Sequence, residues 1–218
     1  MKILSSFWLK MIAITAMTID HVGMIFFPQY IFLRIIGRLA FPIMAFALTE
    51  GYRHTKNHVN YMIRLLIFAV LSAIPFYLLF GTIGDVYFTL FLSLLALYCY
   101  EKANNNIWVV LLISMLAIPF DWSIFGVWVT FVFYKARQDT LKMLLWISAM
   151  LILFYAGLWI YGLWGNGFGL LKSHLFQVGV LLSLFLIQMY NGKRGPNLQY
   201  VFYIYYPFHL LVLYFLIN

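Results

Sequence analysis

Long apolar segments are the feature that most limits how this chain can fold. Residues 60–80 and 141–163 are predominantly apolar over roughly twenty positions each, the length that an α-helix needs to cross a membrane. Neither segment alternates on the two-residue period of a membrane β-barrel strand. Only 9% of the 218 residues are charged, whereas soluble domains carry about 25%. These observations predict an all-α, polytopic bundle of transmembrane helices embedded in a lipid bilayer.

Glycine, proline, asparagine and charged residues divide the chain into about nine apolar segments. We expect spans at 6–27, 31–52, 60–80, 86–100, 107–119, 122–134, 141–163, 170–190 and 199–217. The fifth and sixth segments are short for a bilayer, so 107–134 either crosses with a tilt or forms a hairpin that dips in near residues 119–122. Both alternatives leave the flanking loops on the same side. The sequence contains no internal repeat or linker, and we expect one domain over residues 1–218.

Lysine and arginine fall in alternate loops and predict the orientation of the bundle. If the N-terminus is cytoplasmic, three basic residues lie outside, at Arg34, Arg38 and Lys172. The others lie inside, at Lys2, Lys10, Arg53, Lys56, Arg64, Lys102, Lys135, Arg137, Lys142, Lys193 and Arg194. Cytoplasmic loops carry this excess in membrane proteins. We therefore expect a cytoplasmic N-terminus and an extracytoplasmic C-terminus, and we attribute the formal charge of +8 to topology rather than to a nucleic-acid partner.

Two adjacent polar residues, Asp20 and His21, interrupt the first segment in its predicted outer half. Arg34 and Arg38 lie one turn apart in the outer half of the second. A charge at this depth costs about 2.5–3.5 kcal/mol on insertion scales, so we expect Asp20 to pair with one of the arginines. The remaining positive charge could be balanced by Asp85, Asp121 or an anionic ligand. The alternative to a functional site is a buried ion pair that fixes helix register.

Histidines in the first and last segments are candidate acid–base groups. Residues one apart on a helix point about 100° apart, so Asp20 cannot orient His21, which needs another partner. An imidazole that titrates near neutrality in a polar pocket suits general-base chemistry. In the last segment Pro207 frees the carbonyl of Tyr203 and is expected to kink the helix that carries His209. The alternatives are a satisfied packing histidine and an ordinary kinked aromatic helix.

A second polar cluster lies near the predicted inner face, at Glu50, Arg53, His54, Lys56, His58 and Arg64. The positive-inside bias accounts for most of it, but Glu50 lies within the apolar segment and a basic loop also suits a ligand with phosphate groups. No metal-ligand spacing occurs, and Cys99 is interpreted as a packing or lipid-facing residue rather than an acyl carrier. The glycine-rich residues 165–169 are expected to form an outer loop rather than a nucleotide cradle.

Five stretches that together cover nearly the whole chain resemble a known family. They are LKMIAITAMTIDHVGMIFFP, LRIIGRLAFPIMAFALTEGYRHT, RLLIFAVLSAIPF, VYFTLFLSLLAL and YIYYPFHLLVL. Read in order, they are similar to the TraX family, whose founding member is described as an acetylase of F-type conjugative pilin. The first helix also resembles that of the wider group of multi-spanning membrane acyltransferases. The resemblance implies a bacterial inner-membrane enzyme that transfers an acetyl or other acyl group from cytoplasmic acyl-CoA to an extracytoplasmic amine or hydroxyl.

The resemblance also implies roles for the polar residues. Asp20, His21, Arg38 and His209 are expected to form the catalytic centre, with His21 as general base or transient acyl carrier. The donor site is expected to involve Arg34, Glu50, Arg53, His54 and Arg64, and no metal is expected. The family commonly has acidic residues where this chain has Ala73 and Tyr77, which bears on the identity of the acceptor. A proton-coupled transporter of small solutes and a non-enzymatic membrane assembly factor are the competing classes.

Overall fold

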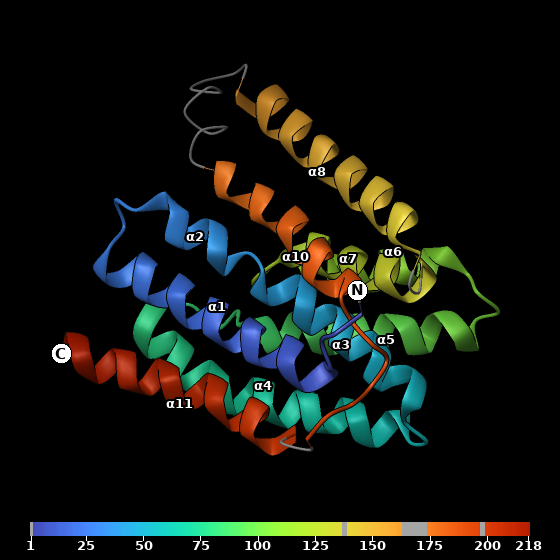
Figure 1. Ribbon diagram of the computed structural model, residues 1–218, viewed down its shortest axis with the longest axis horizontal. Helices are drawn as coiled ribbons and strands as arrows, with labels where there is room; N and C mark the ends of the chain where they lie inside the picture. Colours follow the sequence, from blue (N-terminus) through green and yellow to red (C-terminus); the bar gives the residue numbers. More distant parts are fainter. Residues whose placement is uncertain (1, 137–138, 163–173, 197–198) are drawn as a thin grey trace.

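The computed structural model describes residues 2–136, 139–162, 174–196 and 199–218, and most of this part is helical (Figure 1). The helices are α1 (Ser6–Phe26), α2 (Ile31–Gly37), α3 (Ala40–His54), α4 (His58–Phe80), α5 (Val86–Lys102), α6 (Ile107–Met115), α7 (Ser123–Ala136), α8 (Thr140–Gly162), the 3-10 helix η1 (Leu175–Val178), α10 (Gly179–Gln188) and α11 (Gln199–Ile217). Arg137, Lys172 and the 165–169 loop lie outside the described residues. The prediction of an all-α bundle is confirmed.

Five of the described helical segments are long and apolar enough to cross a membrane. They are Ser6–Phe26, Ile31–His54, His58–Phe80, Thr140–Gly162 and Tyr200–Ile217. The second of these contains α2 and α3, which are separated only by a tight turn at Arg38 and Leu39. The chain is therefore a multi-pass membrane protein, as expected from the apolar segments. The count of nine spans and the direction of the termini remain predictions.

The segment 107–134 forms a helical hairpin made of α6 and α7. These helices have 9 and 14 residues, whereas roughly 20 helical residues are needed to cross the hydrocarbon core. The turn between them is fixed to the start of α5, because the Asp121 amide donates to the Gly84 carbonyl at 2.7 Å and the Thr89 hydroxyl donates to the Asp121 carbonyl. The Trp122 ring stacks on Phe41 of α3 at a centroid distance of 4.4 Å. The hairpin thus reaches the end of the bundle where α5 begins.

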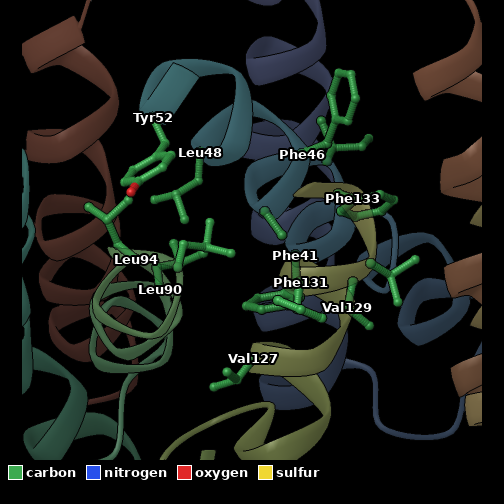
Figure 2. Packing of buried hydrophobic residues seen from close by; sticks show 14 of the residues in the cluster. Phe41, Phe46, Leu48, Tyr52, Leu90, Leu94, Val127, Val129, Phe131 and Phe133 are labelled. Atoms are coloured by element: carbon green, nitrogen blue, oxygen red, sulfur yellow. The ribbon is translucent and has the colours of Figure 1, made fainter. Parts of the chain in front are cut away.

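The core of the bundle lies between α3, α5 and α7 (Figure 2). Phe46 of α3, Leu94 of α5 and Phe133 of α7 are all almost completely buried there. By contrast, large apolar side chains such as Leu153 of α8 and Phe215 of α11 are more than two-thirds exposed at the periphery of the bundle. A helix that shows apolar side chains outward and satisfies its own backbone polar groups is suited to contact with lipid chains. The outer helices therefore present the surface that the bilayer covers.

The N-terminal segment pairs with the loop that follows α10. The Leu4 amide donates to the Met189 carbonyl at 2.8 Å, and the amides of Ser6 and Phe7 donate to the carbonyls of Lys193 and Arg194 at 2.9 and 3.1 Å. These bonds satisfy two of the amides that the first turn of a helix leaves unpaired. They also place the basic loop 191–196 at the start of α1, at the same end of the bundle as the end of α3 and the start of α4 (Figure 1). The predicted topology assigns all of these to the cytoplasmic side.

Candidate active site

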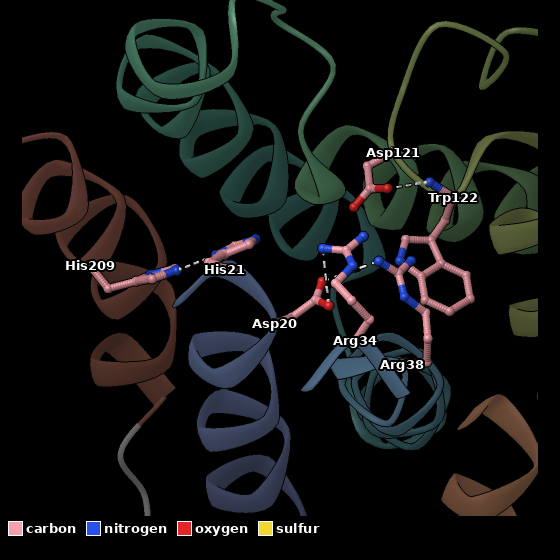
Figure 3. A network of polar contacts seen from close by, with 7 residues as sticks. All are labelled: Asp20, His21, Arg34, Arg38, Asp121, Trp122 and His209. Atoms are coloured by element: carbon pink, nitrogen blue, oxygen red, sulfur yellow. Dashed lines mark hydrogen bonds and ion pairs between the residues drawn. The ribbon is translucent and has the colours of Figure 1, made fainter. Parts of the chain in front are cut away.

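Asp20 of α1 is held between the two arginines of the following segment (Figure 3). Its Oδ1 lies 3.2 Å from Nη1 of Arg34, and its Oδ2 accepts a hydrogen bond from Nη2 of Arg38 at 3.1 Å. Asp20 and Arg38 are 9% and 8% exposed, so the group is removed from bulk solvent. The expected pairing therefore forms, and it involves both arginines. Removing one member of such a buried pair strongly lowers the stability of the folded protein, because it leaves an uncompensated charge.

Asp121 supplies the second negative charge beside the arginines. Its carboxylate faces the guanidinium groups in Figure 3 and interacts electrostatically with Arg38 and Arg34, while its Oδ1 accepts from the Trp122 amide at 2.9 Å. Asp85, the other candidate, plays a different part, since it caps α5 by accepting from the amides of Tyr87 and Phe88 and receives a bond from the Ser72 hydroxyl. Two carboxylates thus face two guanidinium groups.

The same arginines rest on aromatic rings. The guanidinium carbons of Arg34 and Arg38 lie 5.1 and 4.8 Å from the ring centre of Phe176 in η1, and that of Arg38 lies 5.3 Å from Trp122. Cation–π contacts of this kind hold a guanidinium in place from its face while leaving its edge available for hydrogen bonds. The Nε of Arg38 is buried and has no hydrogen-bond acceptor among the described residues. Arg38 therefore has one buried donor that a polar ligand could use.

His21 pairs with His209, 188 residues away in the sequence. Nδ1 of His21 lies 2.8 Å from Nε2 of His209, and the two rings are parallel within 5°. The exposed fractions of the two residues are 8% and 6%. His209 also binds the Tyr205 carbonyl through Nδ1 at 3.1 Å. The separate partner that His21 needs is thus the histidine of the last helix.

Pro207 sits inside α11, two residues before His209. A proline leaves the carbonyl four residues before it without its helical donor, which here is that of Tyr203. The Tyr87 hydroxyl of α5 donates to this region of α11, at 3.1 Å from the Phe202 carbonyl and 3.4 Å from the Tyr203 carbonyl. Tyr87 therefore links the proline region of α11 to the centre of the bundle.

A small cavity of about 50 Å³ adjoins the polar group. Its walls include Asp20, His21 and Arg38 together with Asp121 and Trp122 of the hairpin turn. Asp121 is exposed as a residue while its carboxylate faces the arginines, so the wall of the cavity at this turn lies next to the surface of the protein. The structure thus brings three of the four predicted catalytic residues to one cavity, with His209 directly behind His21.

A larger cavity of about 520 Å³ opens at the opposite end, where α1, α3, α4 and the 191–196 loop meet. Its walls carry four residues that are basic or can become so, Lys10, His54, Arg64 and Arg194, and one acid, Glu50. The two cavities have four wall residues in common: Met44, Tyr87, Leu90 and Phe202. The cavity with the basic entrance and the cavity that contains His21 therefore share part of their walls.

Arg53 does not line either cavity, in contrast to its predicted place among the phosphate-binding residues. Its guanidinium contacts Glu50 at 2.9 Å and donates to the Tyr134 carbonyl at the end of α7. A guanidinium is well suited to such a bridging contact because it offers several donors in one plane. Arg53 therefore joins α3 to α7, and it leaves Glu50, His54 and Arg64 as the predicted donor-site residues that reach the large cavity.

The sequence matches one family along almost its whole length. Residues 5–217 match the family described as TraX protein. The chain belongs to the TraX family. Its relative "Probable fimbrial assembly protein FimC, serogroup H1" from Dichelobacter nodosus is 36% identical over 236 residues, which cover 96% of this chain and 94% of the relative. "Uncharacterized protein RP591" from Rickettsia prowazekii is 50% identical over 38 residues, covering 17% of this chain and 15% of that one. No solved structure matches.

Membership in the TraX family confirms the resemblance and, with the spanning helices, the expected location in a bacterial inner membrane. The resemblance leads us to expect departures from the family pattern at Ala73 and Tyr77, and neither position lies at the small cavity. Tyr77 is 55% exposed on the outside of α4, and Ala73 lies between the buried Ser72 and the exposed Ile74. Neither residue lines the cavity that contains His21.

Sequence reasoning missed two residues of the larger cavity, Lys10 and Arg194. The sequence analysis uses Lys10 and Arg194 only as inner-side positive charges that predict the orientation of the bundle. The signal that could have found Lys10 is its place within the first apolar segment, about three turns before Asp20 on the same helix. Arg194 reaches the cavity because the 191–196 loop pairs with residues 4–7, a contact that one sequence does not reveal.

Gly37 allows the close approach of α2 to Asp20, and its replacement gives a first testable prediction. A Cβ on Gly37 would collide with the Cβ, Cγ and Oδ1 of Asp20. We expect Gly37→Ala to lower the free energy of unfolding by about 1–3 kcal/mol, the usual effect of overpacking. Gly157→Ala is the matched control, because nothing lies within 4 Å of its Cβ in α8, and alanine is the better helix former by about 1 kcal/mol. Thermal unfolding in detergent measures both, and equal melting temperatures would contradict the tight contact.

Proposed function

We propose that this TraX protein is an integral membrane acyltransferase that moves an acetyl or other acyl group from cytoplasmic acyl-CoA to an extracytoplasmic amine or hydroxyl. The observation that carries the proposal is the pair of adjoining cavities. One has a basic entrance at the predicted cytoplasmic end, the other contains His21 and Arg38, and they share four wall residues. A long donor with phosphates at one end and a reactive thioester at the other fits such an arrangement.

The phosphate groups of the donor bind at the large cavity. Arg64 and Arg194 provide guanidinium groups, each of which can pair with a phosphate through two parallel hydrogen bonds. Lys10 adds the positive charge of its ammonium group from α1. Lys10 and Arg194 are close enough for their positive charges to repel. An anion between them relieves this repulsion. The pantetheine arm then passes the apolar wall made by Met44, Leu90 and Phe202.

The acyl carbon is attacked next to His21. The acceptor nitrogen or oxygen forms the new bond to the carbonyl carbon while its proton moves to His21, which acts as general base. The negative charge that develops on the carbonyl oxygen is stabilised by the buried Nε–H of Arg38. Breaking the carbon–sulfur bond releases the CoA thiolate, which takes the proton from His21. Asp20 holds Arg38 in position.

The acceptor reaches the small cavity from the outer end, where Asp121 is exposed beside the hairpin turn. The name of the Dichelobacter relative refers to fimbrial assembly, and the founding member of the family is described as acting on a pilin. We therefore propose an exported pilus or fimbrial subunit as the first acceptor to test, with its free amine as the attacking group. Mass spectrometry of exported proteins, lipids and glycans from cells with and without the gene would identify the acceptor as the molecule that lacks one acyl mass in the deletion strain.

A non-enzymatic assembly factor and a proton-coupled transporter remain distinct alternatives, and consumption of acyl-CoA separates the enzyme from both. Purified protein in nanodiscs should release free CoA from acetyl-CoA when an amine acceptor is present. An assembly factor would bind a pilus subunit without releasing CoA. A transporter would instead move a solute across sealed vesicles when a proton gradient is applied. The sequence contains no internal repeat of the kind common in secondary transporters.

Removal of a phosphate ligand should affect donor binding alone. We expect Arg64→Ala and Arg194→Ala each to raise the KM for acetyl-CoA about ten-fold with kcat nearly unchanged, since a hydrogen bond to a charged group is worth about 1.5–3 kcal/mol. Lys142→Ala, in an exposed pair with Asp139 that lines neither cavity, serves as the control for loss of one positive charge. Steady-state kinetics of CoA release measures all three. An equal effect in Lys142→Ala would indicate a general electrostatic effect and contradict the assigned site.

A further inference from the structure

We propose that His209 is a positioning residue that fixes the tautomer of His21, so that Nε2 of His21 carries the lone pair that accepts the proton. This inference deepens the proposed function and rests on it for the role of His21 as the base. The assignment of the tautomer itself rests only on the hydrogen bonds of the two rings. It replaces the expected second acid–base role of His209 with a role exerted through His21.

The chain of hydrogen bonds starts at the Tyr205 carbonyl. This oxygen has no hydrogen to give, so Nδ1 of His209, which lies 3.1 Å away, must be the donor. A neutral imidazole carries one N–H, and with the proton on Nδ1 its Nε2 can only accept. The nitrogen 2.8 Å from that Nε2 is Nδ1 of His21. Nδ1 of His21 is therefore protonated, and Nε2 of His21 is not.

The neutral state of His209 follows from its surroundings. The ring is buried, and it forms no ion pair with a carboxylate in the part of the chain that the structure describes. An imidazolium without a carboxylate partner in this apolar environment would be strongly unfavourable. The rings that surround the two histidines, Phe80 and Tyr206, provide apolar faces rather than charge. Both histidines are thus neutral in the resting protein.

The free nitrogen of His21 points to the reactive side. Figure 3 shows it at the end of the ring remote from His209, toward Arg34 and Asp121. His21 lines the small cavity together with Arg38. The tautomer that His209 selects is therefore the one that offers a base to the cavity.

A second hydrogen bond joins the same two helices one turn away from the histidine pair. The Thr18 hydroxyl donates to the Ile14 carbonyl at 3.0 Å, so it accepts from the Tyr205 hydroxyl at 2.7 Å. Thr18 lies one turn before His21 on α1, and Tyr205 lies one turn before His209 on α11. Two bonds on successive turns thus tie α11 to α1. During the reaction the proton enters at Nε2 of His21 and leaves from there to the thiolate, while the Nδ1–H stays bonded to His209.

The test combines nitrogen NMR with kinetics on the full chain in lipid bilayers. In wild-type protein labelled with ¹⁵N-histidine, we expect an unprotonated Nε2 and a protonated Nδ1 on His21, identified by the signals lost in His21→Asn. In His209→Leu we expect the opposite tautomer to appear and kcat to fall about ten-fold or more, with the KM for acetyl-CoA unchanged. His209→Gln places an amide oxygen where Nε2 accepts, and should recover the wild-type tautomer and most of kcat.

Tyr205→Phe is the control, because it removes the bond to Thr18 and keeps the carbonyl that binds His209. We expect its His21 tautomer to match the wild type. A wild-type His21 with its proton on Nε2, or a His209→Gln variant indistinguishable from His209→Leu, would overturn the inference. Absence of any acetyl-CoA turnover in the wild type would instead overturn the proposed function, while the NMR signals would still decide whether His209 fixes the tautomer.

Discussion

Replacement of His21 by alanine is expected to lower kcat for acyl transfer by about 10²–10⁴-fold, the usual contribution of a positioned general base. The side chain lines the cavity next to Arg38, and its partner His209 lies on the side away from that cavity. Without the imidazole the attacking amine has no acceptor for its proton. The proposed phosphate ligands lie at the other cavity, so the KM for the donor should change little. Release of labelled CoA from acetyl-CoA by protein in nanodiscs gives both constants.

His58→Ala is the control for this experiment. His58 begins α4, binds the Tyr52 carbonyl at 3.1 Å and lines neither cavity. We expect its kcat to stay within about two-fold of wild type, since the half-buried ring packs on Tyr52 and reaches neither cavity. Full activity in His21→Ala, with the protein correctly folded, would remove His21 from the chemistry.

Removal of the Asp20 carboxylate is expected to lower the free energy of unfolding by about 3–5 kcal/mol, because it leaves the buried guanidinium of Arg38 and the half-buried one of Arg34 with too little negative charge. Asp20→Ala breaks contacts of 3.2 and 3.1 Å to Arg34 and Arg38 at once. Lys142→Ala is the matched control, since it breaks an ion pair of the same 3.1 Å in an exposed position and leaves the Asp139 carboxylate as the cap of α8. Exposed pairs contribute about 0–1 kcal/mol, so this variant should unfold close to wild type. Thermal unfolding in detergent compares the two.

A double variant separates loss of charge balance from loss of packing. Asp20→Ala combined with Arg34→Leu leaves Arg38 facing Asp121, one charge of each sign. If imbalance causes the loss, the double variant should be more stable than Asp20→Ala alone, with a coupling free energy of about 0.5–3 kcal/mol. Additive losses from the two substitutions would mean that packing, and not charge, accounts for the effect.

The long helices could be read from the sequence because apolar length is a local property. The segments expected at 6–27, 60–80, 141–163 and 199–217 appear as Ser6–Phe26, His58–Phe80, Thr140–Gly162 and Gln199–Ile217. The segment expected at 31–52 is interrupted at Arg38 and Leu39, where the Leu39 amide bonds to Ile36 three residues back and tightens the turn. The described part of the eighth segment begins with a short 3-10 turn, and α10 extends only over Gly179–Gln188.

The site could be predicted only in part, because it joins segments that are distant in the sequence. The pairing of Asp20 with Arg34 and Arg38 followed from a short connection and from the cost of buried charge. The contact of His21 with His209 depends on how α11 packs against α1, which the spacing of residues along one chain does not specify. The same holds for Arg194, brought to the large cavity by the pairing of residues 4–7 with the 189–194 segment, and for Arg53, whose acceptor is the carbonyl at the end of α7.

Affinity labelling with bromoacetyl-CoA tests most directly whether a cytosolic thioester reaches His21. The reagent carries an electrophilic carbon where the acyl group would lie and needs no acceptor. It should be applied to the Cys99→Ala variant, which removes the chain's one thiol. We expect a single adduct on His21, found by mass spectrometry of its peptide and prevented by free CoA. An unmodified His21, with label absent or spread over other residues regardless of added CoA, would contradict a donor path from the basic cavity to the His21 cavity.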